Sequence, residues 1–331
     1  GVRMRAVVRS ETWPIRGGFR IARGARTDAD VLVVELRQER QVGRGECVPY
    51  ARYGESIRSV SEAIERATEG WTDLATARAT LSRMARGAAR SALDCALWDL
   101  EAKLAGRPVW SLLGFDRPPE PVSTMRTVSV NTPESMHEAA TAFAHAPVIK
   151  VKVDGGADLE RIEAVHAAAP QAQLVVDPNE AWSTEQTRAW LPELARLGVS
   201  VLEQPLPEGA DSLLEAIERA VPVCADESFY DRRSLRSAQG RYDMVNVKLD
   251  KAGGISEALT CVRRARQLGI DLMVGCMVST SLAIEPALLL TAFARYVDLD
   301  GPILLESDRT GARHERDVGL LRASPSVWGH A

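Results

Sequence analysis

The sequence lacks the features of a membrane protein or of a nucleic-acid-binding protein. Its longest apolar stretch, SLAIEPALLL at 281–290, contains Glu285 and Pro286, whereas a membrane-spanning helix needs about 20 apolar residues. No segment near the N-terminus resembles a signal peptide. The arginines form no basic run and the net charge is −4, which argues against a nucleic-acid partner. We therefore expect a cytoplasmic, globular protein with neither a membrane nor a nucleic-acid partner.

Cysteine and histidine are scarce and poorly placed for the chemistry that they usually support. The five cysteines lie far apart with no CxxC pair, which is typical of reduced thiols in a cytosolic protein. None of the five histidines falls at a predicted strand end, and HEAATAFAH at 137–145 lacks the HExxH spacing of a zinc site. No GxGxxG opens a helix after the first strand and no GxxxxGK[ST] occurs, so neither nucleotide-binding motif is present.

The sequence changes character at the turn-rich segment DRPPEP, residues 116–121. Before it come two β-type segments, at 3–15 and 29–50, with a Gly/Arg-rich loop at 16–28 between them. Two helical segments follow, at 56–70 and 76–113. The second helical segment carries a stop signal at Gly106 and Pro108. Strands followed by helices indicate an α+β domain, expected over residues 1–121.

After residue 121, short β-branched runs alternate with segments of helix length. Eight strands are predicted, at 126–130, 148–153, 172–177, 199–205, 221–226, 244–250, 270–277 and 294–300. Eight strand–helix alternations favour an α/β fold with a parallel (β/α)8-type barrel, a modified TIM barrel whose active site lies at the carboxyl ends of its strands. A doubly wound sheet would alternate in the same way, but neither nucleotide-binding motif supports it. We expect the barrel over 122–309 and a segment at 310–331 that returns to the first domain.

Charged residues recur at the ends of successive predicted strands, at intervals of 25, 26, 23 and 22 residues: Lys152, Asp177, Glu203, Asp226 and Lys248. Each interval is about the length of one strand, one helix and two loops, so all five groups would lie on one rim of the barrel. Asp298 follows after about two further units. A single acidic residue after a strand is usually a helix cap or a turn former, but that explanation does not extend to five charges in register.

This set of residue types points to one kind of chemistry. Three carboxylates without histidine are hard oxygen ligands, which suit Mg²⁺ better than Zn²⁺. Bound Mg²⁺ can chelate a substrate carboxylate and stabilise charge that develops on it. Lys152 and Lys248 flank the acidic strands, and repulsion from a neighbouring cation would lower the pKa of such a lysine and make it a base. Two bases on opposite faces of a substrate allow 1,1-proton transfer, as in racemisation or epimerisation.

The segments KVK, VDPNEAW, LEQPLP, ADES and NVKLDKAGG, in this order and spacing, resemble the enolase superfamily and its muconate-lactonizing-enzyme subgroup. The resemblance covers essentially the whole chain and implies that the N-terminal α+β domain is a capping domain. DLDG at 298–301 resembles the DxD motif of dipeptide epimerases. IARGARTDAD, ECVPYARYGES, GAARSALDCALWDL and GCMVSTS are similar to the L-Ala-D/L-Glu epimerases in particular.

The resemblance implies the metal and proton-transfer roles. One Mg²⁺ would be bound by Asp177, Glu203 and Asp226. The two acid/base catalysts would be Lys152 and Lys248. Lys150, on the same strand face as Lys152, would help to stabilise an enolate.

It also implies how a substrate would be held. Asp298 and Asp300, which share one face of a strand, would bind the N-terminal ammonium group of a dipeptide. Arg26 would bind the side-chain carboxylate of a glutamate, with Arg20 and Arg23 of the same loop as alternatives. Supporting residues would be Thr127, Cys276 and Val278 in the pocket lining and Asn179 beside the metal ligands.

We therefore predict a Mg²⁺-dependent isomerase that inverts the Cα of the C-terminal residue of a dipeptide, L-Ala-D-Glu or L-Ala-L-Glu, by two-base transfer through a metal-stabilised enolate. Its pathway would be peptidoglycan recycling, and a homo-oligomer is compatible with the sequence. The alternatives are a muconate cycloisomerase, an o-succinylbenzoate synthase and an N-acylamino-acid racemase, none of whose substrates carries an ammonium group. A metal-binding protein without catalysis would be expected to lack Lys152 or Lys248, and both are present.

Overall fold

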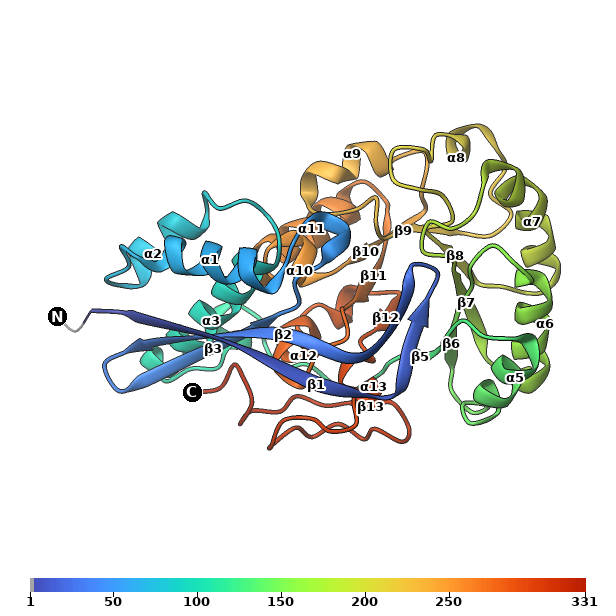
Figure 1. Ribbon diagram of the computed structural model, residues 1–331. Helices are drawn as coiled ribbons and strands as arrows, with labels where there is room; N and C mark the ends of the chain where they lie inside the picture. The colour runs from blue at the N-terminus through green and yellow to red at the C-terminus, as the bar shows by residue number, and fades with distance from the viewer. Residues whose placement is uncertain (1–2) are drawn as a thin grey trace.

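The computed structural model describes residues 3–331 and begins with an antiparallel sheet of three strands in the order β1–β2–β3. These strands are Arg5–Ile21, Gly24–Gln38 and Gln41–Cys47. The helices that follow are α1 (Ile57–Thr68), α2 (Leu74–Leu81), α3 (Ala88–Ala105) and α4 (Val109–Leu112). Helix α3 packs closely on β3, because Gly43 and Gly45 have no side chains to hold the helix away. This α+β layer lies beside the rest of the chain (Figure 1).

The second part of the chain is a parallel sheet of eight strands hydrogen-bonded in sequence order. The strands β5 to β12 are Arg126–Val128, Val148–Lys152, Gln173–Asp177, Val201–Glu203, Val223–Ala225, Met244–Val247, Asp271–Gly275 and Tyr296–Asp298. The amide of Met125 donates to the carbonyl of Val297 at 2.9 Å, which brings the last strand against the chain that enters the first. The prediction of an eight-stranded barrel with an N-terminal α+β capping domain is confirmed.

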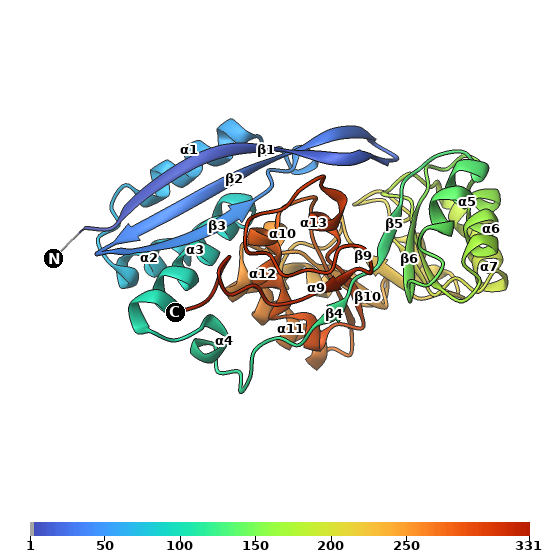
Figure 2. The same cartoon turned by 90° about the horizontal axis from the view of Figure 1, so that it is seen from below.

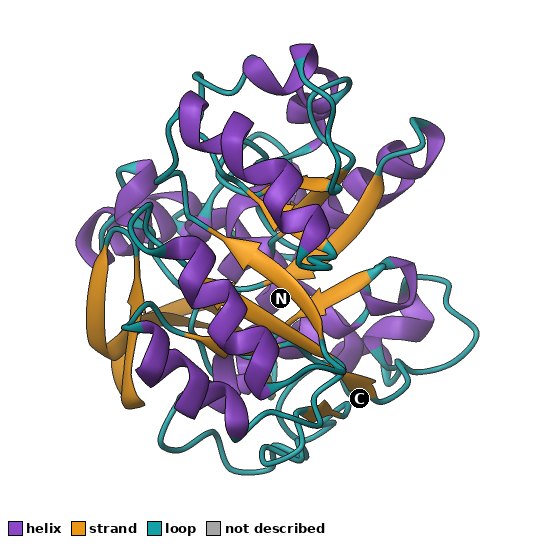
Figure 3. Cartoon of the chain, turned by 90° about the vertical axis from the view of Figure 1, so that its right-hand side faces the viewer, coloured by secondary structure: helices purple, strands orange, loops and turns teal. Residues whose placement is uncertain are grey.

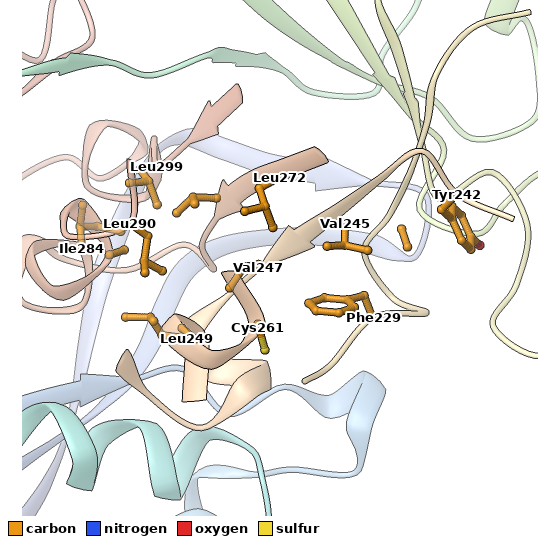
Figure 4. Packing of buried hydrophobic residues seen from close by; sticks show 14 of the residues in the cluster. Phe229, Tyr242, Val245, Val247, Leu249, Cys261, Leu272, Ile284, Leu290 and Leu299 are labelled. Atoms are coloured by element: carbon orange, nitrogen blue, oxygen red, sulfur yellow. The ribbon is translucent and has the colours of Figure 1, made fainter. Parts of the chain in front are cut away.

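Helices cover the outside of this sheet (Figure 3). The helices α5 to α13 are Pro133–Thr141, Asp158–Ala168, Thr184–Arg196, Leu213–Ala216, Leu235–Ala238, Leu249–Ala252, Ile255–Gln267, Ser281–Leu288 and Gly301–Leu304. Their apolar faces meet the outward-facing residues of the strands, as Figure 4 shows for Val245, Val247 and Leu272 against Cys261 and Ile284. No helix of residues 3–331 is long and apolar enough to cross a bilayer.

The inside of the barrel has an apolar layer beneath a charged one. The apolar layer contains Val175, Val201, Cys224, Met244 and Tyr296, with Met125 and Met273. Successive side chains of a strand point to opposite faces, so the residue two positions later points inward as well. Two positions after Val175, Val201, Cys224, Met244 and Tyr296 come Asp177, Glu203, Asp226, Asn246 and Asp298, in the same order. The strand period therefore carries the charged groups to the open end of a packed barrel.

Two predictions about the first domain are wrong. The Gly/Arg-rich segment 16–28 is not a loop: it forms the tip of the β1–β2 hairpin, with Phe19 opposite Arg26 and Ile21 opposite Gly24. The tip extends over the barrel (Figure 2). Phe19 and Ile21 of the tip line a cavity together with barrel residues, which are distant in sequence. The helical segment 76–113 is broken into α2, α3 and α4, and the chain turns between α2 and α3 at Gly87 with φ 127°. The predicted stop at Gly106 is confirmed, with φ 64° directly after α3.

The C-terminal segment lies along the barrel and reaches α3. Strand β13 (Leu320–Leu321) pairs with β4 (Val122–Ser123). The amide of Gly329 donates to Asp99 Oδ1 at 2.8 Å, and the indole of Trp328 donates to the carbonyl of Cys95 at 3.0 Å. The chain end is thereby anchored on the capping domain.

Candidate active site

A cavity of about 360 Å³ opens at the carboxyl ends of the barrel strands and is closed on one side by the β1–β2 hairpin. The predicted site residues in its lining are Arg26, Thr127, Lys150, Lys152, Asn179, Asp226, Lys248, Cys276, Val278, Asp298 and Asp300. Asp177 and Glu203 are fully buried and contact the lysines of the lining. The structure therefore brings every predicted site residue to one place, from the ends of all eight barrel strands and from the hairpin.

Asp177, Glu203 and Asp226 form a compact acidic cluster whose carboxylate oxygens lie within 4.8 Å of one another. Burial raises the pKa of Glu203 well above its ordinary value, with the neighbouring carboxylates adding to this effect. Burial opposes ionisation of Asp226 too, but Lys248 and Lys251 hold its pKa well below the ordinary value. Three buried carboxylates at this spacing offer only oxygen donors, which fits Mg²⁺. This cluster could hold such an ion.

Three lysines contact the cluster from the side of the cavity. Lys150 Nζ lies 2.6 Å from Asp298 Oδ2, 2.9 Å from Glu203 Oε2 and 3.3 Å from Asp177 Oδ2. Lys152 Nζ, two residues along the same strand, lies 2.7 Å from Asp177 Oδ2. The third, Lys248, comes from the far side of the acidic strands.

Lys248 Nζ lies 2.8 Å from Asp226 Oδ2. Burial alone would lower the pKa of Lys248, but the charge of Asp226 raises it above the ordinary value. The charge of Asp226 thus outweighs burial and the like charge of Lys150, whereas the lowering expected from the sequence depends on a metal cation bound beside this lysine. Lys248 is therefore held in its acid form in this structure.

Asp298 and Asp300 present two carboxylates to the cavity beside Thr127. The hydroxyl of Thr127 donates to Asp300 Oδ2 at 2.6 Å. Burial and then the charge of Asp298 raise the pKa of Asp300 to about 7. Asp298 Oδ1 is buried and has no hydrogen-bond partner within residues 3–331. An ammonium group of a ligand would satisfy this oxygen and relieve the repulsion between the two acids.

The three arginines of the hairpin tip have different surroundings. Arg26 is exposed and lines the cavity, and its guanidinium group makes no hydrogen bond to the part of the chain that the structure describes. Arg23 also lines the cavity, but its guanidinium group is engaged by Glu227 at 2.8 Å. Arg20 is absent from the cavity lining and is linked to the barrel through its backbone. Of these three, Arg26 is the one whose charge is available to a ligand.

Sequence reasoning missed residues that hold the metal-binding candidates in place. Lys251 is buried, and its ammonium group donates to Asp226 Oδ1 at 2.7 Å and to the carbonyls of Asp226 and Asn246. Gln204 Oε1 accepts from the amide of Asp226 at 2.9 Å. Lys251 stands one helical turn after Lys248, and Gln204 directly follows Glu203. Their positions in the sequence, close to Lys248 and Glu203, could have identified them as supporting residues.

The sequence matches two family models. The model described as "Mandelate racemase / muconate lactonizing enzyme, N-terminal domain" matches residues 3–114. The model described as "Enolase C-terminal domain-like" matches residues 134–319. Together these matches cover the α+β layer and most of the barrel.

Curated relatives and solved structures agree with these matches. The chain is 46% identical to an L-Ala-D/L-Glu epimerase of Escherichia coli, over 92% of this chain and 96% of the relative. It is 39% identical to an N-acetyl-D-glutamate racemase of Pseudoalteromonas, over 91% of this chain and 96% of the relative. A crystal structure of an enolase family member from Agrobacterium tumefaciens with homology to dipeptide epimerases, with bound sodium and L-Ala-L-Glu, has a TM-score of 0.93 at 41% identity and covers 98% of this chain and 100% of that one. The structure of a dipeptide epimerase from Enterococcus faecalis, complexed with Mg and L-Leu-L-Tyr, has a TM-score of 0.89 at 27% identity. The match covers 99% of this chain and 98% of that one. The chain thus belongs to the mandelate racemase/muconate lactonizing enzyme family of the enolase superfamily.

Proposed function

We propose that the protein is a Mg²⁺-dependent dipeptide epimerase, an isomerase that inverts the Cα of the C-terminal residue of L-Ala-D-Glu or L-Ala-L-Glu. One observation carries the proposal: a single cavity is lined by two lysines from opposite sides of an acidic cluster and by the carboxylate pair Asp298 and Asp300. The relatives named as dipeptide epimerases support it.

In this proposal Asp177, Glu203 and Asp226 hold the Mg²⁺ ion. When bound, the ion supplies a Lewis acid that stabilises negative charge on the carboxylate of the substrate. Lys152 and Lys248 remove and return the proton at Cα, one lysine acting as the base while the other acts as the acid.

Other side chains orient the reacting atoms. Lys150 donates hydrogen bonds to the developing charge, and Asn179 Oδ1, which accepts from Lys152 Nζ at 3.1 Å, orients that lysine. Asp298 and Asp300 bind the N-terminal ammonium group, with Thr127 fixing the second carboxylate. Arg26 pairs with the side-chain carboxylate of glutamate, and the remaining wall is formed by Cys276 and Val278.

The test is proton exchange at Cα. L-Ala-L-Glu is incubated with the protein and Mg²⁺ in D₂O, and the glutamyl Cα proton is followed by NMR. We expect loss of that signal together with formation of the L-Ala-D-Glu diastereomer, and neither change after EDTA treatment. Absence of exchange with Mg²⁺ present would refute the proposal.

A second candidate is racemisation of an N-acylated glutamate, favoured by the similarity to the N-acetyl-D-glutamate racemase. Such a substrate carries the glutamate carboxylates but no ammonium group, so Asp298 and Asp300 would have no cation to bind. N-acetyl-L-glutamate is therefore tested in the same assay. Turnover faster than that of the dipeptide would favour this second reaction.

We also propose the boundaries 1–121 for the capping domain, 122–309 for the barrel and 310–331 for the returning segment. The first division is supported by the two family models, one of which ends at residue 114 while the other begins at residue 134. A cytoplasmic location, a homo-oligomer and a role in peptidoglycan recycling remain predictions from the sequence.

A further inference from the structure

The tip of the β1–β2 hairpin belongs to the capping domain but extends over the barrel (Figure 2). Its residues form one wall of the cavity. Phe19, Ile21 and Arg26 of this tip line the cavity, so their positions depend on how the tip is held against the barrel. We propose that Arg23 is a positioning residue that docks the hairpin tip onto the barrel and thereby assembles the substrate pocket for any dipeptide. The kinetic part of this inference rests on the proposed function, whereas its structural part does not.

The guanidinium group of Arg23 joins three parts of the fold. Its Nη1 donates to Glu227 Oε2 at 2.8 Å, to the carbonyl of Asn179 at 3.1 Å and to Glu180 Oε1 at 3.3 Å. Its Nη2 donates to the hydroxyl of Tyr50. These acceptors follow β9, β7 and β3, so one side chain connects the hairpin tip to two strand ends of the barrel and to the capping domain.

Glu227 makes this contact specific. Its side chain is 1% exposed and directly follows the metal-ligand candidate Asp226. One of its oxygens accepts from Arg23 and from Asn179 Nδ2, while Oε1 has no partner among the described residues. A buried carboxylate is costly to ionise without a cation at close range, and Arg23 supplies such a cation. The contact is therefore unlike an exposed ion pair, which contributes little.

The docked tip is coupled to the proposed catalytic groups. Asn179, whose carbonyl accepts from Arg23, also accepts from Lys152 Nζ through its side chain at 3.1 Å. The ring of Phe19 lies with its centroid 6.0 Å from the same Lys152 Nζ. Docking through Arg23 therefore closes the pocket over Lys152 and leaves Arg26 free for the substrate. Loss of Arg23 should affect every dipeptide equally, whereas loss of Arg26 should affect only those with an acidic side chain.

The structural part is tested by amide hydrogen exchange of the full-length protein without substrate. Arg23→Met should speed the exchange of peptides covering residues 16–30 by at least tenfold and leave the barrel strands unchanged. Arg20→Met is the matched control, because the side chain of Arg20 makes no hydrogen bond within residues 3–331, and it should leave the tip protected. Unchanged exchange at the tip in Arg23→Met would overturn the proposal. If that variant does not fold, Arg23→Gln is measured in its place.

The kinetic part compares L-Ala-L-Glu with L-Ala-L-Ala. Arg23→Met should lower kcat/KM for both dipeptides by the same factor, at least tenfold, and Arg23→Lys should recover part of it because a lysine can still reach Glu227. Arg26→Met should lower kcat/KM for the glutamate dipeptide alone. If Arg23→Met behaves like Arg26→Met, then Arg23 binds substrate and the proposal is wrong. If the unaltered protein turns over neither dipeptide, the proposed function fails, and the exchange measurement still decides whether Arg23 docks the tip.

Discussion

Replacing Asp300 by asparagine should remove a pH dependence from dipeptide binding. The Asp300 side chain lies in the cavity lining, accepts from Thr127 at 2.6 Å and is only 7% exposed. Burial and the charge of Asp298 raise its pKa to about 7. A protonated Asp300 cannot form an ion pair with an ammonium group, so dipeptide affinity should fall as the pH falls through 7.

The size of the effect follows from the ionised fraction. With a pKa of about 7, roughly three quarters of Asp300 is ionised at pH 7.5 and roughly a tenth at pH 6, so KM should rise about eightfold between them. The assay is epimerisation of L-Ala-L-Glu with saturating Mg²⁺ over this range, below the pKa of about 8 of the amino group of the dipeptide. Asp300→Asn should show a higher KM that no longer changes with pH.

The same substitution should stabilise the fold. Since the pKa of Asp300 rises from 3.8 to about 7 on folding, ionising this group at pH 8 lowers stability by about 4 kcal/mol relative to acid pH. This loss of folding free energy is absent below about pH 3.8 and increases as the pH rises to about 7. Asp300→Asn, which keeps an acceptor for Thr127, should therefore raise the thermal unfolding midpoint at pH 8 and do so less at pH 5. A KM of the unaltered protein that is flat from pH 6 to 7.5, or an unchanged midpoint at pH 8, would refute the reasoning.

Three further predictions concern catalysis, metal and packing. Lys152→Ala and Lys248→Ala should each abolish epimerisation, while one of them still exchanges deuterium into a single epimer; full turnover in both would contradict a two-base reaction. Removal of Mg²⁺ by EDTA should stop turnover without unfolding the chain. Glu203→Gln should weaken Mg²⁺ binding, measured by calorimetry, by more than about tenfold. An unchanged Mg²⁺ affinity would exclude Glu203 as a ligand. Gly45→Ala should destabilise the fold by about 1–3 kcal/mol in urea unfolding, because the new β carbon would lie 2.0 Å from a carbonyl oxygen of α3. Gly70→Ala, with open space around it, is the control.

The barrel and its charged rim were predictable because both depend on local periods. A strand period of two places Asp177 above Val175 and Glu203 above Val201, and a βα unit of about 24 residues brings these strand ends to one rim. Neither inference needs a contact between distant segments. The charges were visible because each one interrupts an otherwise apolar strand.

The hairpin tip was not predictable in this way. Segment 16–28 is rich in glycine and arginine, which usually indicates a loop, and its strands are held by contacts far along the chain. The amide of Val130 donates to the carbonyl of Arg20 at 3.1 Å, and Arg23 reaches Glu227.

The capping domain also holds a second wall of the pocket. The loop after β11 carries Cys276 and Val278 into the cavity lining and ends at Thr280, whose amide donates to Glu46 Oε2 at 2.8 Å. Glu46 is buried on β3 and is paired with Arg309 at 2.6 Å. The loop is therefore held by hydrogen bonds to a capping-domain carboxylate whose charge Arg309 balances.

The proposed proton-transfer groups, in contrast, belong to the barrel strands and to the carboxylates beside them. Substitutions in the hairpin or on β3 can therefore reshape the substrate pocket while the carboxylate contacts of Lys152 and Lys248, which lie within the barrel, remain. This separation of the pocket walls from the proton-transfer groups explains why relatives with the same fold are named for different substrates. A change of specificity should then map to the capping domain and to the walls that it holds, while a change of reaction should require a change on the charged rim.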